Sequence, residues 1–172
     1  MTDRYITIYL RDHLAMGRAG IDFARRVANS NDHNLIGSRL DEFASGLDEE
    51  IDAILRAMEL LDIEPSQLKM AGAWLAEKAG RLKFNGEFKR YSPLSRVLEL
   101  EFLMAAVQAR KGLWKTMRDA RKVYPALDEL PIERFAARAD EQLTELSGMH
   151  QKAARKMLKT GQQRDERPGR RG

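Results

Sequence analysis

Four ionisable side chains stand out because each interrupts the apolar face of a different predicted helix. They are His13, Glu50, Glu101 and His150. Carboxylates and imidazoles are common ligands of metal ions, so two of each could bind one ion if the helices brought all four together. The plainer interpretation is that each is a buried polar group whose neighbour satisfies its hydrogen bonds.

The apolar residues around these positions recur at intervals of three and four, which is the spacing of helices. They predict long helices over about residues 5–29, from the turn at 29–32 to about Leu61, over 93–124 and over 131–159. A shorter helix is expected over about 66–82. Gly17 and Gly20 lie within the first helix, and because glycine is a poor helix former they predict a close approach of another helix there.

The third long helix has the clearest start, since Ser92 can cap it and Pro93 needs no amide hydrogen at the first position. Residues 94–109 are apolar on almost every side of this helix. A helix of that kind is usually surrounded by others. The sequence therefore predicts that the rest of the chain packs around it.

The order of these elements resembles that of the ferritin-like four-helix bundle superfamily, in which a long connection joins the second and third helices. Residues 9–14 (YLRDHL) and 92–101 (SPLSRVLELE) are also similar to stretches in uncharacterised bacterial proteins of that class. The resemblance covers about residues 5–159. It implies an all-α, antiparallel four-helix bundle with a short crossover helix.

Ferritin-like oxidases and iron-storage proteins bind two metal ions through Glu residues and Glu-x-x-His motifs. This sequence contains no Glu-x-x-His, so a dimetal centre of iron or manganese is not expected. The alternative is a divergent site made of His13, Glu50, Glu101 and His150. At about 1.5 Å per residue, however, His13 and Glu50 lie at one level of such a bundle, and Glu101 and His150 lie at another. The sequence therefore favours two buried Glu–His pairs and no cofactor.

The sequence also lacks the residues that several other common catalytic and binding sites require. There is no cysteine, which excludes disulfides, thiolate metal sites and cysteine nucleophiles. Gly-x-Ser-x-Gly, Gly-x-x-x-x-Gly-Lys and Gly-x-Gly-x-x-Gly are also missing, so the usual hydrolase and nucleotide-binding sites are not expected. The N-terminal residues show no signal-peptide pattern, and a cytoplasmic, non-catalytic protein is predicted.

Charge is segregated along the chain. Residues 41–64 carry nine acids and one Arg, residues 110–122 carry six basic residues and one Asp, and residues 159–172 account for +3 of the net +4. We expect a bundle domain over 1–159 and a disordered basic tail over 160–172. The tail is either a solubilising appendage or a weak nucleic-acid contact through its arginines, which are Arg164, Arg167, Arg170 and Arg171.

A partner surface is predicted in the connection between the second and third long helices, where aromatic residues gather. These are Trp74, Phe84, Phe88 and Tyr91. They either cover the core of this chain or meet another chain. The function expected from the sequence is therefore association with itself or with a protein partner. Metal binding is the alternative, and nucleic-acid association through the tail is the third possibility.

Overall fold

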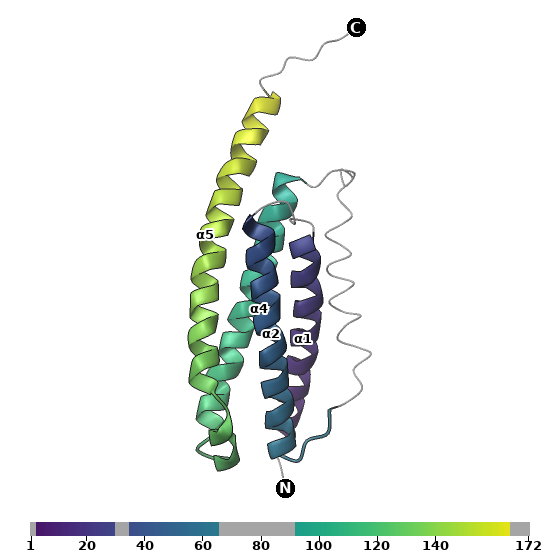
Figure 1. The fold of residues 1–172 in the computed structure, drawn as a ribbon, viewed down its shortest axis with the longest axis vertical. Helices are drawn as coiled ribbons and strands as arrows, with labels where there is room; N and C mark the ends of the chain where they lie inside the picture. Colours follow the sequence, from purple (N-terminus) through teal and green to yellow (C-terminus); the bar gives the residue numbers. More distant parts are fainter. Residues whose placement is uncertain (1–2, 30–34, 66–91, 166–172) are drawn as a thin grey trace.

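A computed structural model describes residues 3–29, 35–65 and 92–165 of the chain (Figure 1). These stretches form α1 (Arg4–Asn29), α2 (Leu35–Leu60), α4 (Pro93–Ala120), a short 3-10 helix η1 (Pro125–Glu129) and α5 (Ile132–Asp165). No strand occurs within these described stretches, so the predicted all-α class is confirmed. The short helix expected over 66–82 lies outside the described residues.

Local signals explain two of the helix ends. Ser92 Oγ accepts a hydrogen bond from the amide of Ser95 at 3.1 Å, and Pro93 follows it as the first helical residue. The predicted start of α4 is therefore confirmed. At the end of α2, Asp62 adopts φ 55°, and the amide of Ile63 donates to the carbonyl of Met58 at 2.8 Å. A left-handed residue at this position is a common helix stop.

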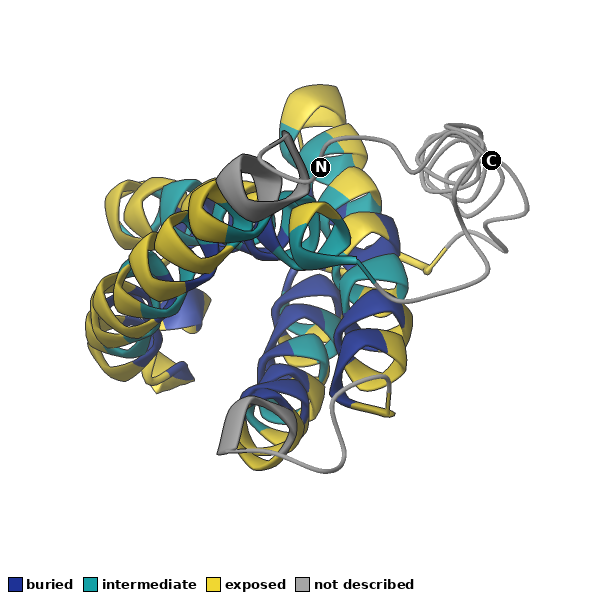
Figure 2. Cartoon of the chain, turned by 90° about the horizontal axis from the view of Figure 1, so that it is seen from above, coloured by how far each residue is buried: buried dark blue, intermediate teal, exposed yellow. Residues whose placement is uncertain are grey.

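The helices associate mainly as two pairs, α1 with α2 and α4 with α5. Arg11 of α1 donates to the carbonyl of Glu64 at 2.8 Å, and Arg25 pairs with Asp48 at 2.6 Å. Tyr9 connects the two pairs by a 3.1 Å hydrogen bond to Thr116 of α4. Seen from above, the buried residues face the interior and the exposed ones face outward (Figure 2).

The buried apolar residues form two clusters, one toward each end of the molecule. One includes Trp114, Phe135 and Met58, and the other includes Phe43, Leu100 and Leu146. Along α2 the boundary between the clusters falls between Leu47 and Ala53, and along α4 it falls between Val107 and Leu113. The core is therefore divided at one level of the bundle.

Three features differ from the sequence-based expectations. α4 is not enclosed on all sides, because Leu94, Ala105 and Ala109 are exposed and its buried residues form one face. The helix ends at Ala120, before the predicted 124. α5 continues to Asp165, so residues 160–165 are helical where a disordered tail is predicted.

Candidate functional site

A charged pair occupies the boundary between the two apolar clusters. Glu50 of α2 is only 1% exposed, and Arg110 of α4 is also buried. Arg110 Nε lies 3.0 Å from Glu50 Oε2, and the indole N–H of Trp114 donates to the same oxygen at 2.6 Å. The sequence correctly placed Glu50 on the core face of its helix.

Helical spacing explains why these two side chains meet. Glu50 lies three residues after Leu47 and four before Ile54, so it occupies a position of the apolar seam of α2. Arg110 lies three residues after Val107 and three before Leu113, which are both fully buried on α4. Each helix therefore contributes one polar residue to an otherwise apolar seam, at the same level.

α5 extends this charged pair to the surface. Arg138 lies 4.0 Å from Glu50 Oε1 and donates to Glu49 at 2.6 Å. Gln142 accepts a hydrogen bond from Arg110. We refer to Glu50, Arg110 and Arg138, one from each of three helices, as the polar layer.

Burial disfavours the charged form of both Glu50 and Arg110. It raises the pKa of Glu50, and the positive charge of Arg110, the Trp114 hydrogen bond and Arg138 act in the opposite direction. Burial likewise lowers the pKa of Arg110, which the charge of Glu50 opposes. One oxygen, Glu50 Oε1, accepts no hydrogen bond from any described residue. A buried carboxylate oxygen without a donor is uncommon and costly.

Glu50 and Arg110 also line a cavity of about 290 Å³ between α1, α2 and α4. The wall is otherwise almost entirely apolar, with Phe102, Leu103 and Ile54 among its residues. The helices leave room here because the facing residues of α1 and α4 are small. Those residues are Gly17, Gly20, Ala105, Ala106 and Ala109.

The two glycines of this wall behave differently. A Cβ on Gly17 would lie 2.5 Å from Ile51 Cδ1, so the end of a side chain of α2 packs against this glycine. A Cβ on Gly20 would meet nothing within 4 Å. Gly20 therefore borders open space, and the prediction of a close approach is wrong at that position.

His13 lines the same cavity but does not form the predicted pair with Glu50. The carboxylate of Glu50 is instead held by Trp114 and Arg110. The ring of His13 packs edge-on against Tyr9 with 4.5 Å between centroids. Burial lowers the pKa of His13, partly opposed by Asp12, so the imidazole is neutral at pH 7. A neutral imidazole offers one donor and one acceptor.

Glu101 and His150 do form the second predicted pair, with His150 Nε2 3.0 Å from Glu101 Oε1. The pair is not buried, because the exposed fractions of the side chains are 53% for Glu101 and 27% for His150. Neither residue lines the cavity. The four candidate ligands thus lie in two places, and the described residues contain no group of three or more His, Cys, Asp or Glu that could hold a metal ion.

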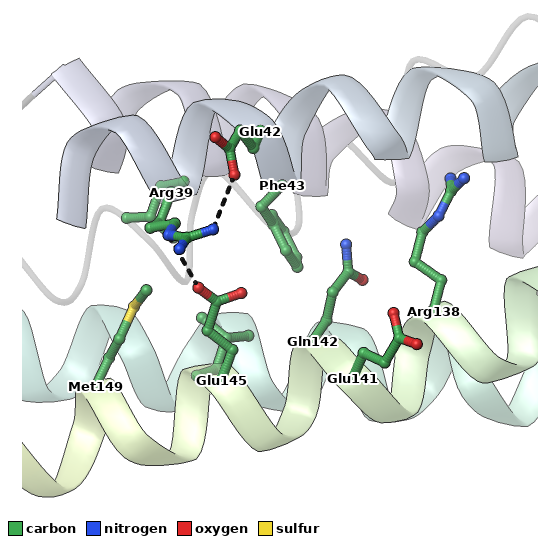
Figure 3. A pocket seen from close by; sticks show the side chains of 10 residues that line it. Arg39, Glu42, Phe43, Arg138, Glu141, Gln142, Glu145 and Met149 are labelled. Atoms are coloured by element: carbon green, nitrogen blue, oxygen red, sulfur yellow. Dashed lines mark hydrogen bonds and ion pairs between the residues drawn. The ribbon is translucent and has the colours of Figure 1, made fainter. Parts of the chain in front are cut away.

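A second hollow of about 210 Å³ lies between α2 and α5, on the other side of Phe43 (Figure 3). Its wall is charged: Arg39 pairs with Glu42 at 3.3 Å and with Glu145 at 3.5 Å. Arg138 and Gln142 connect it to the polar layer. Because its charges largely pair with one another, this groove is a weaker candidate for a binding site than the cavity.

Sequence reasoning missed Arg110, Trp114 as a hydrogen-bond donor, and the cavity itself. Arg110 belongs to the basic stretch 110–122, but its spacing from Val107 and Leu113 is the signal that places it in the core. The aromatic residues Trp74, Phe84, Phe88 and Tyr91 lie outside the described residues. So do Arg167, Arg170 and Arg171, whereas Arg164 belongs to α5.

Comparison with known proteins identifies no relative. No protein-family model matches the chain, and no curated protein or solved structure is found to be similar to it. Among the described helices, none is both long and apolar enough to cross a membrane. The polar layer and the cavity are the features of the described residues that suggest a function.

Proposed function

We propose that this chain is a non-catalytic binding protein that holds a small apolar molecule in the cavity between α1, α2 and α4. The observation that carries the proposal is an apolar cavity of about 290 Å³ with a buried carboxylate in its wall, one oxygen of which lacks a donor. Ligand sites are typically clefts or cavities lined mostly by apolar side chains, with a few polar groups that fix the orientation of the ligand.

The polar groups of the wall define the ligand class. Glu50 already has the cations Arg110 and Arg138 beside it, so a neutral ligand needs no further charge compensation. The carboxylate of Glu50 would accept a hydrogen bond from a hydroxyl or an aromatic N–H group of the ligand. The neutral His13 offers a second polar contact on the same wall. A neutral, ring-sized molecule with one donor fits these features best.

We also propose that the helices form an antiparallel, ferritin-like bundle. Arg11 of α1 contacts Glu64, which follows the end of α2, and Arg25 of α1 contacts Asp48 of α2. Contacts between α4 and α5 likewise join residue 118 to 133 and residue 101 to 150. The residue numbers therefore run in opposite directions within each pair, which supports this arrangement.

A second set of contacts concerns the direction of α2 relative to α4. The start of α1 lies near the end of α2, through Arg11 and Glu64, and near the end of α4, through Tyr9 and Thr116. α2 and α4 then run in the same direction, as the second and third helices of a ferritin-like bundle do.

Indole and indene make a matched pair of probes for this site. They share one ring frame, but only indole carries an N–H donor. We expect both to bind in titration calorimetry, and indole to bind roughly two- to tenfold more tightly, because a hydrogen bond contributes about 0.5–1.5 kcal/mol.

Cavity filling provides the control. Ala106→Phe fills the space between α1 and α4 and should abolish binding of both probes. Ala137→Phe adds the same bulk at an exposed position of α5, away from the cavity, and should leave both affinities unchanged. Binding that survives Ala106→Phe, or equal affinity for the two probes, would contradict the proposed site.

The other expectations from the sequence remain predictions. Association with itself or with a protein partner would use aromatic residues that lie outside the described part of the chain. A metal-binding role would require at least one further ligand beside Glu101 and His150. A cytoplasmic location likewise stays a prediction.

A further inference from the structure

The C-terminal third of α5 carries a concentration of positive charge. From Leu146 to Arg164 the sequence contains no acidic residue, and the basic residues of the stretch are Lys152, Arg155, Lys156, Lys159 and Arg164. Figure 1 shows this part of α5 extending past the ends of the other described helices. We refer to residues 152–164 as the basic arm.

The basic arm differs from the other basic stretch of the chain. In residues 110–122, five of the six basic side chains have an acidic partner: Arg110, Lys111, Arg118, Arg121 and Lys122. That stretch is therefore largely neutralised within the bundle. In the arm, by contrast, no ion pair with any described residue is found for Lys152, Arg155, Lys156 or Lys159.

Net charge shows the same division. Residues 146–172 hold eight basic and two acidic residues, a net charge of +6, which leaves −2 for residues 1–145. Attraction to a polyanion would thus come from the end of the chain and not from the bundle. A localised basic surface of this kind is typical of proteins that bind nucleic-acid phosphates.

Helical spacing places the cations of the arm on its outer side. Ala153 is buried and Met157 packs partly against the bundle, whereas Lys152, Arg155, Lys156 and Lys159 are exposed. Positions 152 to 159 span about 10 Å of helix. They can therefore contact several phosphates along one backbone.

The arm fits phosphates better than a lipid surface. Amphipathic helices that bind membranes pair their cations with a broad exposed apolar face. Here Leu158, at 62% exposed, is the one large apolar side chain that the described part of the arm presents to solvent. From these observations we propose that the basic arm binds the phosphate backbone of nucleic acids without reading their sequence. This inference is independent of the cavity.

Salt dependence tests the proposal. The probe is a fluorescently labelled 20-base-pair DNA duplex, and its affinity for the full chain is measured by anisotropy over a range of NaCl concentrations. Each phosphate contact contributes about −0.9 to the slope of log K against log [salt]. Lys152→Gln/Lys156→Gln/Lys159→Gln should therefore reduce the magnitude of the slope by about three and weaken binding at low salt.

A matched variant removes the same charge elsewhere. Arg4, Arg18 and Lys115 are exposed and have no ion pair with a described residue, so Arg4→Gln/Arg18→Gln/Lys115→Gln should leave the slope unchanged. An equal loss in both variants, or no loss in the arm variant, would overturn the proposal. Binding to anionic lipid vesicles without binding to the duplex would also overturn it, in favour of a membrane surface.

Discussion

Arg110→Ala should lower the free energy of unfolding by about 3–5 kcal/mol, because it removes the closest cation from the buried carboxylate of Glu50. The guanidinium of Arg110 lies 3.0 Å from Glu50 Oε2, and both residues are buried. Removing one partner of a buried pair is strongly destabilising, whereas removing both is often tolerated. Urea unfolding monitored by circular dichroism measures the difference.

The double variant Glu50→Met/Arg110→Met is the decisive control for this prediction. It replaces the pair by apolar side chains and should cost much less than Arg110→Ala alone. The exposed pair Arg118–Glu133, which joins α4 to α5, offers a comparison, and loss of Arg118 should have little effect. An Arg110→Ala variant that behaves like the Arg118 variant would show that Glu50 is not buried as a charge.

Trp114→Ala should destabilise the protein by a similar amount, about 3–5 kcal/mol, because it removes one of the largest fully buried side chains. The ring of Trp114 packs against Phe135 with 4.7 Å between centroids. Its N–H is also a hydrogen-bond donor to Glu50, at 2.6 Å. Packing and hydrogen bonding therefore both contribute to the loss.

Trp114→Phe separates these two contributions. It keeps an aromatic ring but removes the donor, and should cost about 1–3 kcal/mol through the unsatisfied carboxylate oxygen, in addition to the lost volume. In a Glu50→Met background the part due to the hydrogen bond should disappear. Equal costs in the two backgrounds, measured by the same urea unfolding, would mean that the indole N–H contributes nothing to holding Glu50.

The sequence predicted the helices well because apolar spacing is a local property. The seam of α2 placed Glu50 in the core, and the capping residues placed the start of α4. The spacing of Arg110 from Val107 and Leu113 likewise indicates a core position, but it does not show that Arg110 pairs with Glu50. Periodicity gives the face of a helix, but Arg110 reaches Glu50 through a long side chain, and its neighbours in sequence resemble an ordinary basic helix end.

Neither the cavity nor the helical conformation at the end of α5 could be predicted from the sequence, and the physical reasons differ. The cavity depends on the distance between α1 and α4 at Gly20 and Ala106, which neither helix specifies alone. At the end of α5, the polar composition suggested disorder. Gln, Lys and Arg are nevertheless good helix formers, and adding residues to an existing helix is easier than starting a new one.

The polar layer gives the cavity its chemical character. Without Glu50 and Arg110, the space between α1, α2 and α4 would be an apolar void, which destabilises a core and selects ligands only by size. With them, the wall includes a carboxylate that the Trp114 hydrogen bond and Arg110 hold in position. Preorganised polar groups of this kind give a binding site its selectivity.

The central claim is that this cavity admits an apolar molecule, and xenon tests it most directly. Xenon binds in apolar cavities of proteins and can be located in crystals equilibrated under the gas. We predict a xenon atom in contact with Leu103, Ala106 and Ile54 in the wild-type protein, and its loss in Ala106→Phe. A crystal in which side chains fill this space and xenon does not enter would contradict the proposed function.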